Sequence, residues 1–163
     1  MHKALIGFDK NEYPEIEIFQ KYFECDFCEY SEDYFNKNIS KYSILVPHLY
    51  LKLTHELINK ASNLKYIFTP STGTNHLDIK AINNNDINLY CLSDNAEFIS
   101  EISSTAELAW LLILAANRKI VQLNKRVLTE NSWKNNDLRG NQLKNKTIGI
   151  IGFGRLGKMI FNY

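Results

Sequence analysis

Strand-like segments alternate with segments of helical periodicity through the first 92 residues, and this alternation constrains the fold more than any other feature. The apolar segments are mostly continuous instead of alternating with polar residues, which is typical of parallel strands covered on both faces. The predicted strands are Lys3–Phe8, Phe27–Tyr30, Tyr42–Pro47, Leu64–Thr69 and Ile87–Leu92. The predicted helices are Tyr13–Phe23 with Pro14 in its first turn, Glu32–Asn38, a helix capped by Thr54 and ending near Ser62, and Asp78–Asn84. The pattern therefore predicts an α/β fold with a parallel sheet and helices on both faces.

The second part of the chain is organised differently. Residues 93–103 are polar and predict a loop, after which a long helix begins. Ser104 and Glu107 have the spacing of a capping box, so we interpret Glu107 as a capping residue rather than a catalytic one. Residues 106–116 are apolar on nearly all sides, which predicts a helix buried on all sides.

Beyond this helix the sequence predicts a polar arm and one more strand. The helix becomes amphipathic after Asn117, which places its end on a surface against a second domain or subunit. The arm, Asn131–Lys146, is interrupted by Trp133, and the strand is Thr147–Ile151. We expect three parts: residues 1–103 with the parallel sheet, residues 104–146 with the long helix and the arm, and residues 147–163 from the last strand onward.

Charge and length argue against several classes of partner. The 19 basic and 18 acidic residues leave a formal charge of +1, which gives no electrostatic case for nucleic acid or an anionic membrane. The apolar run Leu108–Ala116 is shorter than the roughly 20 residues that a bilayer span needs. The N-terminal residues lack the pattern of a signal peptide, so we expect a cytoplasmic protein.

Cys25 and Cys28 form a lone CxxC pair. A zinc site would require a second pair of ligands, and a redox site would place the pair at a helix N-terminus. Because the pair lies in a strand-like segment, we favour reduced, partly buried thiols over either function.

The glycine-rich hexamer GFGRLG, Gly152–Gly157, follows the apolar segment Thr147–Ile151 directly and opens a helical pattern. In this strand–turn–helix context it predicts a dinucleotide-binding turn, with a packing turn that binds no ligand as the alternative. Gly152 would permit the tight turn, Gly154 would let the backbone approach a pyrophosphate, and Gly157 would allow close helix–strand packing. The amides of Arg155 and Leu156 would hold the phosphates.

A second candidate site is the loop TPSTGTNHLD, Thr69–Asp78. Gly73 permits unusual backbone geometry, and successive amides of Ser71, Thr72 and Gly73 would form a nest for a substrate carboxylate. The alternative is a simple connection capped by Asn75 or Asp78. His76 is interpreted as a hydrogen-bonded loop residue, and His48 has only its position at a strand end to suggest a function.

Three motifs in order resemble the NAD-dependent D-isomer-specific 2-hydroxyacid dehydrogenases, which include phosphoglycerate dehydrogenases. They are LKYIFTPSTGTNHLDIKAI, SSTAELAWLLILAANRKI and W…LRGNQLKNKTIGIIGFGRLGK, and together they span roughly Leu64 to Lys158. The resemblance implies a flavodoxin-like substrate-binding domain over residues 1–103, and an interdomain helix with a dimerisation arm around Trp133 over residues 104–146. It implies that residues 147–163 begin an NAD-binding Rossmann domain. It implies that the backbone of Thr72–Gly73 holds the substrate carboxylate, that Gly152–Gly157 holds the NAD pyrophosphate, and that hydride passes between the nicotinamide and C2 of a 2-hydroxy acid.

Two departures from the family pattern shape the expectation for this chain. The segment SDNAEFISEIS lacks the family's Pro-Gly-Gly stretch, and the resemblance places the catalytic arginine, glutamate and histidine beyond Tyr163. No residue is therefore assigned a catalytic role, and no metal ligand is predicted. We expect a chain of dehydrogenase ancestry that is inactive alone, with its tail ordered by a second subunit. The alternatives are a non-catalytic dimerising or carboxylate-binding module, and an unrelated flavodoxin-like module with a fortuitous glycine turn.

Overall fold

The computed structural model describes all residues except 1, 12, 14–16, 29–30 and 135. The chain forms two compact units, Met1–Ile99 and Ser100–Tyr163, which are described separately below. The predicted division at residue 103 concerns function and stays a prediction.

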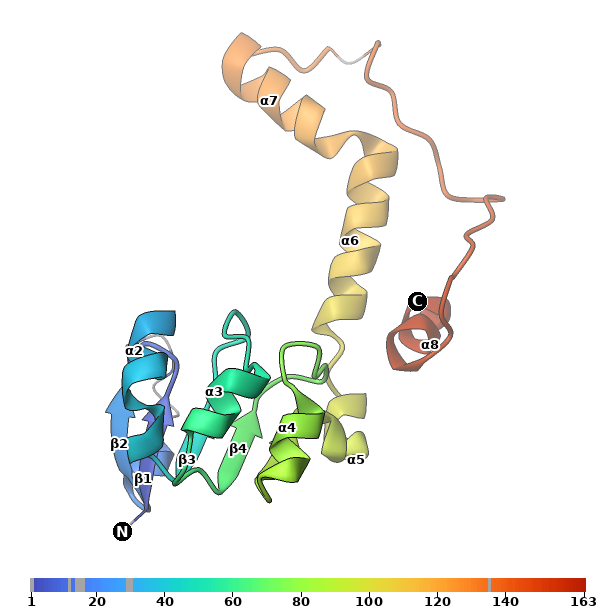
Figure 1. Cartoon of the computed structure of the whole chain (residues 1–163). Coiled ribbons are helices and arrows are strands. Elements are labelled where there is room, and N and C mark those ends of the chain that lie inside the picture. The colour runs from blue at the N-terminus through green and yellow to red at the C-terminus, as the bar shows by residue number, and fades with distance from the viewer. Residues whose placement is uncertain (1, 12, 14–16, 29–30, 135) are drawn as a thin grey trace. The chain divides into compact units, whose positions relative to one another are not determined.

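The first unit contains a five-stranded parallel sheet with the order β2-β1-β3-β4-β5 (Figure 1). This is the flavodoxin-like strand order, so the predicted fold class is confirmed. The strands are β1 (Lys3–Ile6), β2 (Glu24–Phe27), β3 (Ile44–Val46), β4 (Tyr66–Thr69) and β5 (Asn88–Cys91). The strand predicted at Phe27–Tyr30 was placed too late in the sequence, because the edge strand β2 begins at Glu24 and ends at Phe27. Its polar residues do not fit the apolar pattern by which strands were predicted. Residues 29 and 30 lie outside the described residues.

Helices connect the strands of the sheet, and local capping explains the starts of those that follow β2. They are α1 (Glu17–Gln20), α2 (Glu32–Asn38), α3 (His55–Lys60) and α4 (Ile79–Asn84), with a 3-10 turn at Ile39–Lys41. The predicted N-cap Thr54 is confirmed, since its hydroxyl accepts from the Leu57 amide at 3.4 Å. Asp78 caps α4 in the same way through the Ala81 amide at 3.0 Å. The predicted position of Pro14 lies outside the described residues.

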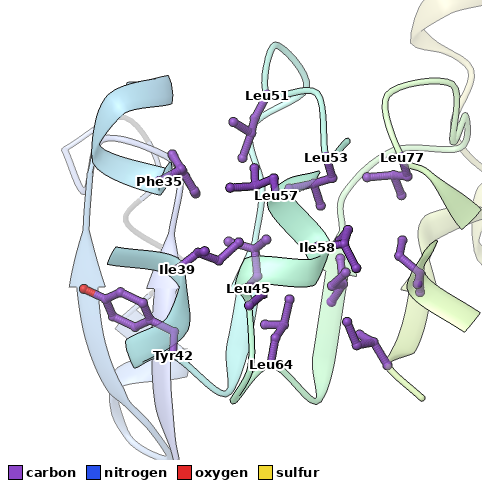
Figure 2. Close-up of a cluster of buried hydrophobic side chains, with 14 of the residues drawn as sticks. Phe35, Ile39, Tyr42, Leu45, Leu51, Leu53, Leu57, Ile58, Leu64 and Leu77 are labelled. Atoms are coloured by element: carbon purple, nitrogen blue, oxygen red, sulfur yellow. The ribbon is translucent and has the colours of Figure 1, made fainter. Parts of the chain in front are cut away.

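The two faces of the sheet carry separate hydrophobic clusters. The larger contains Leu5, Leu45 and Ile67 of the sheet packed with side chains of α2, α3 and α4 (Figure 2). The smaller contains Ala4, Ile6, Ile44 and Val46, with the partly buried Phe19 and Phe23 against it. Each fully buried leucine or isoleucine contributes about 1.5–3 kcal/mol, so the larger cluster supplies most of the stability of this unit.

The CxxC pair is divided between these two faces. Cys25 packs with the smaller cluster and Cys28 with the larger one, because residues three apart near a strand point to opposite sides. Burial raises the pKa of both thiols, that of Cys28 to about 11. Both cysteines are free, and in the described part of the chain no group of three His, Cys, Asp or Glu residues could hold a metal ion. The thiols are therefore partly buried, as predicted, and the absence of a redox or zinc function stays a prediction.

The segment after β5 is not the predicted loop. Leu92–Asp94 forms a 3-10 turn, and α5 spans Ala96–Ser100. Asn95 explains the start of α5, since its side-chain oxygen accepts from the Phe98 amide at 3.0 Å. Asparagine is a common N-cap residue, so Asn95 could have indicated this helix from the sequence. It was overlooked because the whole segment is polar and was interpreted as a loop.

The second unit is built on α6 (Ser104–Arg118), α7 (Ile120–Glu130) and α8 (Arg155–Asn162). The predicted single long helix is wrong, because Lys119 adopts a left-handed conformation with φ of 52° and separates α6 from α7. The amide of Asn141 in the arm donates to the carbonyl oxygen of Asn117 at 3.2 Å. The arm is therefore hydrogen-bonded to the end of α6, where the helix is interrupted. A Cβ at Gly140 would overlap this backbone, which shows how closely the arm returns to the end of α6.

The start of α6 differs from the predicted capping box by one residue. Ser103 is the N-cap, and its backbone conformation leaves its hydroxyl to donate to the Glu107 carboxylate instead of accepting from an amide. Glu107 therefore has a local structural contact, as interpreted from the sequence, but with a different partner.

The predicted burial of α6 on all sides is wrong for the chain by itself. Of its residues only Ala106 is buried, and Leu108, Leu111 and Leu112 are each more than half exposed. Residues 96–118 are long and apolar enough to pass a test for a membrane span by length and composition. However, α5 and α6 are separate helices divided at Glu101–Ser103, and the 15 residues of α6 would reach only about 22 Å of the roughly 30 Å hydrocarbon core.

The arm is held on α7 by one ion pair. Arg126 donates through both terminal nitrogens to Asp137, at 2.5 and 2.7 Å, and this contact lowers the pKa of Asp137 to about 2. Because the pair is exposed to solvent, we attribute to it the path of the arm rather than the stability of the unit.

A polar cluster at the edge of the sheet yields the first prediction. The Asp26 carboxylate accepts from Lys3 at 2.9 Å and from the Tyr42 hydroxyl at 2.8 Å. The hydrogen bond from Lys3 is the larger cause, and that from Tyr42 the second, that holds the pKa of Asp26 below its usual value. The stabilisation is therefore present above the unfolded-state pKa of about 3.9 and is lost as the pH falls through the lower folded-state pKa.

We expect Asp26→Asn to lower the free energy of unfolding by about 1 kcal/mol at pH 7, measured by urea denaturation. The difference from the unsubstituted chain should shrink as the pH is lowered below about 4. The control is Asp33→Asn, whose partner Lys37 forms only an exposed i,i+4 pair and should contribute below about 0.5 kcal/mol. Equal effects of the two substitutions, or a difference that does not change with pH, would contradict this account.

Candidate functional site

The three glycines of the turn Gly152–Gly157 differ in their local geometry. Gly152 has φ of +92°, the only positive value at a glycine among the described residues. Gly154 is the N-cap of α8, and a Cβ there would meet nothing within 4 Å. A Cβ at Gly157 would overlap the carbonyl oxygen of Gly152. The turn is therefore tight at its first glycine, open at its second and closely packed at its third.

This turn fits a pyrophosphate. The amides in the first turn of a helix have no acceptor within that helix, and they lie at the positive end of its dipole. Gly154 supplies no side chain as a cap, so the space in front of α8 is left to a ligand. Arg155 and Leu156 are the first residues of the helix, and their amides stand at this end. Their binding of phosphate stays a prediction.

Two long-range hydrogen bonds fix α8 within its unit. The Trp110 indole donates to the carbonyl oxygen of Ile160 at 3.0 Å, and the Arg155 guanidinium donates to that of Ile102 at 2.7 Å. Neither side chain was assigned a role from the sequence. Residues separated by 50 or more positions give no periodic signal by which one sequence could reveal such contacts.

The segment before the turn is not the predicted strand. Residues 147–151 form no strand in the described chain, and Ile151 is fully exposed. The five strands of the sheet all belong to the first unit. A strand requires a neighbour for its backbone N–H and C=O groups, and the described chain provides none for this segment.

The second predicted site, the loop after β4, is organised by side-chain hydroxyls. Thr69 is buried at the end of β4, and its Oγ1 lies 2.8 Å from Oγ of Ser71. The Ser71 hydroxyl donates to the carbonyl oxygen of Gly73 at 2.7 Å. Within the described chain the amides of Thr72 and Gly73 donate to no protein acceptor. The loop therefore presents unoccupied donors beside an ordered hydroxyl chain.

One part of the prediction for this loop was wrong. Gly73 does not adopt a positive φ, and a Cβ there would meet nothing within 4 Å. The alternating backbone conformation of an anion nest is therefore absent, and Gly73 leaves space rather than allowing a special turn. Binding of a carboxylate by Ser71, Thr72 and Gly73 stays a prediction that depends on amides and space.

His76 closes the same loop from the other side. Its Nε2 lies 3.5 Å from Oγ1 of Thr69, and burial lowers its pKa, so it is neutral at pH 7. Its carbonyl oxygen accepts from the Leu53 amide at 2.8 Å, which joins two loops at the ends of neighbouring strands. These contacts agree with the interpretation of His76 as a hydrogen-bonded loop residue.

A largely apolar cavity of about 650 Å³ lies at the carboxyl ends of the strands. Phe8 and His48 line it at the point between β1 and β3 where the strand order changes direction, the usual place for ligands in such sheets. Thr69 and Pro70 connect it to the substrate loop. Among the described lining residues there is no lysine or arginine, so the donors available to a carboxylate are uncharged groups such as the loop amides and the Thr69 hydroxyl, together with the His48 imidazole.

A parallel sheet with this strand order and a glycine turn at a helix N-terminus are features of α/β proteins that bind nucleotides. Residues 6–136 match the sequence model of the D-isomer specific 2-hydroxyacid dehydrogenase catalytic domain, and residues 110–163 match that of the NAD binding domain of the same family. The chain belongs to this family. An unrelated flavodoxin-like module with a fortuitous glycine turn is thereby excluded, and NAD is supported as the cofactor.

Individual relatives agree with this assignment. The chain is 37% identical over 121 residues to D-3-phosphoglycerate dehydrogenase of Archaeoglobus fulgidus, covering 74% of this chain and 22% of that protein. It is 29% identical over 146 residues to hydroxypyruvate reductase of Thermotoga maritima, covering 90% and 44% respectively. The crystal structure of D-lactate dehydrogenase from Aquifex aeolicus, complexed with NAD and lactic acid, matches with a TM-score of 0.80 at 23% identity and covers 97% of this chain and 46% of that one. The chain thus spans less than half the length of these relatives.

The close packing at Gly157 yields the second prediction. Alanine is favoured over glycine in a helix by about 1 kcal/mol, but overlap of its Cβ with the Gly152 carbonyl costs about 1–3 kcal/mol. The steric cost should prevail. We expect Gly157→Ala to speed amide hydrogen exchange throughout α8, measured by mass spectrometry of the peptide that contains it.

Gly149→Ala is the matched control, because a Cβ at this position would meet nothing within 4 Å. It should leave exchange in α8 unchanged. Slower exchange in the Gly157→Ala protein would show that helix propensity prevails over the contact, and would contradict the proposed packing of the turn.

Proposed function

We propose that residues 1–163 carry the substrate-carboxylate loop and the cofactor pyrophosphate turn of an NAD-dependent oxidoreductase that acts on the CH–OH group of a D-2-hydroxy acid. The observation that carries the proposal is the glycine turn, whose three glycines have the tight, open and packed geometries that a pyrophosphate turn requires. Membership in the D-2-hydroxyacid dehydrogenase family supports the reaction class.

The chain's own residues would bind and orient the two reactants. Bound NAD would supply the nicotinamide that accepts hydride from C2 of the hydroxy acid. The amides of Arg155 and Leu156, at the N-terminus of α8, would hold the pyrophosphate. The amides of Thr72 and Gly73 would hold the substrate carboxylate, while the bonds of Ser71 to Thr69 and Gly73 keep the loop in place.

We further propose that residues 1–163 alone bind ligands without turning over substrate. His76 is the titratable side chain bonded within the substrate loop, and its Nε2 is directed at Thr69. The unpaired segment 147–151 leaves the glycine turn without a strand beneath it. These two observations also favour the alternative of a non-catalytic carboxylate-binding module. We place the protein in the cytoplasm, which is supported by its three free cysteines.

The NAD proposal is tested by calorimetric titration of NADH into the chain, together with assays of pyruvate, glyoxylate and hydroxypyruvate reduction. We expect weak NADH binding and no reduction. Gly154→Val should abolish binding without unfolding the chain, since φ of −82° suits valine and no atom lies near the added Cβ, while the side chain would block the approaching phosphate.

Three outcomes are distinguishable in this experiment. Absence of NADH binding by the unsubstituted chain contradicts the cofactor proposal. Unchanged binding by Gly154→Val contradicts the role of the turn. Reduction of any of the three 2-oxo acids contradicts the proposed inactivity and supports the oxidoreductase proposal.

We also propose a homodimer formed through α6, α7 and the arm around Trp133. The support is exposed apolar surface, which a monomer rarely presents over two consecutive helices. Leu111 is 61% exposed and Val121 is 74% exposed, and Trp133 on the arm is 85% exposed. A second copy would bury these side chains and would explain why α6 is apolar on nearly all sides.

Sedimentation equilibrium tests this proposal. We expect a dimer for the unsubstituted chain and a monomer for Leu111→Glu, because a carboxylate in an apolar interface costs several kcal/mol. The control is Ile18→Glu, an exposed apolar residue of α1 in the first unit, which should remain dimeric. A monomeric unsubstituted chain, or a Leu111→Glu dimer of unchanged strength, would contradict the interface.

A further inference from the structure

The helix that carries the glycine turn is attached to α6 by two hydrogen bonds that run in opposite directions. From α8, the Arg155 guanidinium donates to the carbonyl oxygen of Ile102, just before α6 begins. From α6, the Trp110 indole donates to the carbonyl oxygen of Ile160, near the end of α8. Both donors are half-buried, which makes each bond stronger than it would be in water.

The two bonds hold α8 near both of its ends. Arg155 is the first residue of the helix and Ile160 lies five residues later, a separation of about 7.5 Å along the helix axis. One bond alone would leave α8 free to pivot about its contact point. Two bonds at different heights along the helix also fix its rotation, and they thereby fix the direction in which its first amides point.

The other contacts of the turn are less able to fix this direction. Gly157 packs on the carbonyl of Gly152, but both belong to the turn itself and move with it. Residues 147–151 form no strand that could anchor the turn from the preceding side. Phe153 and Phe161 contact each other edge-on at 5.7 Å between ring centroids, again within the turn and its helix. In the described chain the docking on α6 is therefore the contact that orients α8.

We propose that Arg155 and Trp110 are positioning residues for the cofactor, which hold the pyrophosphate-binding end of α8 in its binding orientation through the backbone of Ile102 and Ile160. The inference rests on the proposed NAD-binding function. Trp110 lies outside the glycine turn, and Arg155 lies within it but acts through its side-chain bond to Ile102, which the glycine pattern does not include. Binding sites lose affinity when their donors are held too loosely, so breaking either bond weakens cofactor binding.

A direct electrostatic role for Arg155 makes a different prediction. If its charge attracted the phosphates, affinity would depend on that charge and would be independent of Trp110. If Arg155 acts by positioning, loss of the neutral Trp110 bond has the same consequence as loss of Arg155. Trp110 therefore provides the decisive substitution, since replacing it changes no charge.

The experiment is calorimetric titration of NADH into the 163-residue chain at low and high salt, with hydrogen exchange of α8 measured in parallel. We expect Trp110→Phe and Arg155→Met each to raise the Kd for NADH about fivefold, the equivalent of one net hydrogen bond. Both should speed amide exchange in α8, and the loss caused by Trp110→Phe should be the same at both salt concentrations. Arg155→Lys, which retains a cationic donor, should recover part of the affinity.

Arg139→Met is the control for loss of a positive charge, because Arg139 is exposed on the arm and, within the described residues, donates only to Asn136. It should change neither affinity nor exchange in α8. Faster exchange in Trp110→Phe with unchanged NADH affinity would overturn the positioning role while leaving the NAD proposal intact. Full recovery by Arg155→Lys with no effect of Trp110→Phe would assign Arg155 a charge role instead. Absence of NADH binding by the unsubstituted chain would overturn both proposals.

Discussion

Burial of both faces of a sheet made from very short strands is the constraint on which the first unit depends. Each strand has only three or four residues. Because successive side chains of a strand point to opposite faces, these few residues are divided between two clusters. The connections from β2 to β3, β3 to β4 and β4 to β5 all cross the sheet in one direction, and right-handed crossovers therefore place α2, α3 and α4 on one face. The connection from β1 to β2 runs the opposite way and places α1 on the other face, where the smaller cluster lies. The same geometry brings the ends of β1, β3 and β4 to one edge, where the cavity and the substrate loop are found.

The sequence predicted those parts of the fold that are determined locally. Buried strands such as Ile44–Val46 are apolar without interruption, and helices such as α3 and α4 begin at side chains that cap them, so both could be located without knowledge of their neighbours. Prediction failed where structure depends on a distant partner. The edge strand β2 is recognised by its pairing with β1, the break at Lys119 coincides with the return of the arm to Asn117, and Thr147–Ile151 requires a neighbouring strand to form at all.

In the candidate site, too, local features were predicted better than contacts with distant residues. The positive φ of Gly152 agrees with the expected tight turn, because a tight turn is a property of a short segment. Gly157 is closely packed, but against the carbonyl of Gly152 and not against the predicted strand. Gly73 was assigned a special backbone conformation that it does not have, since a glycine in a loop can also serve by leaving space. The side-chain contacts of Arg155 and Trp110 were not predicted, because their acceptors are backbone carbonyls more than 45 residues away. Every residue has a carbonyl, so the sequence does not show which one accepts.

The central claim is that the turn Gly152–Gly157 binds the pyrophosphate of NAD, and backbone amide chemical shifts during an NAD titration of the isotope-labelled chain test it most directly. The account predicts that the largest saturable shifts occur at the amides of Gly154, Arg155, Leu156 and Gly157, with ADP-ribose reproducing them because it contains the same pyrophosphate. Saturable shifts confined to the Thr69–Asp78 loop, or no saturable shift anywhere in residues 152–157, would contradict it.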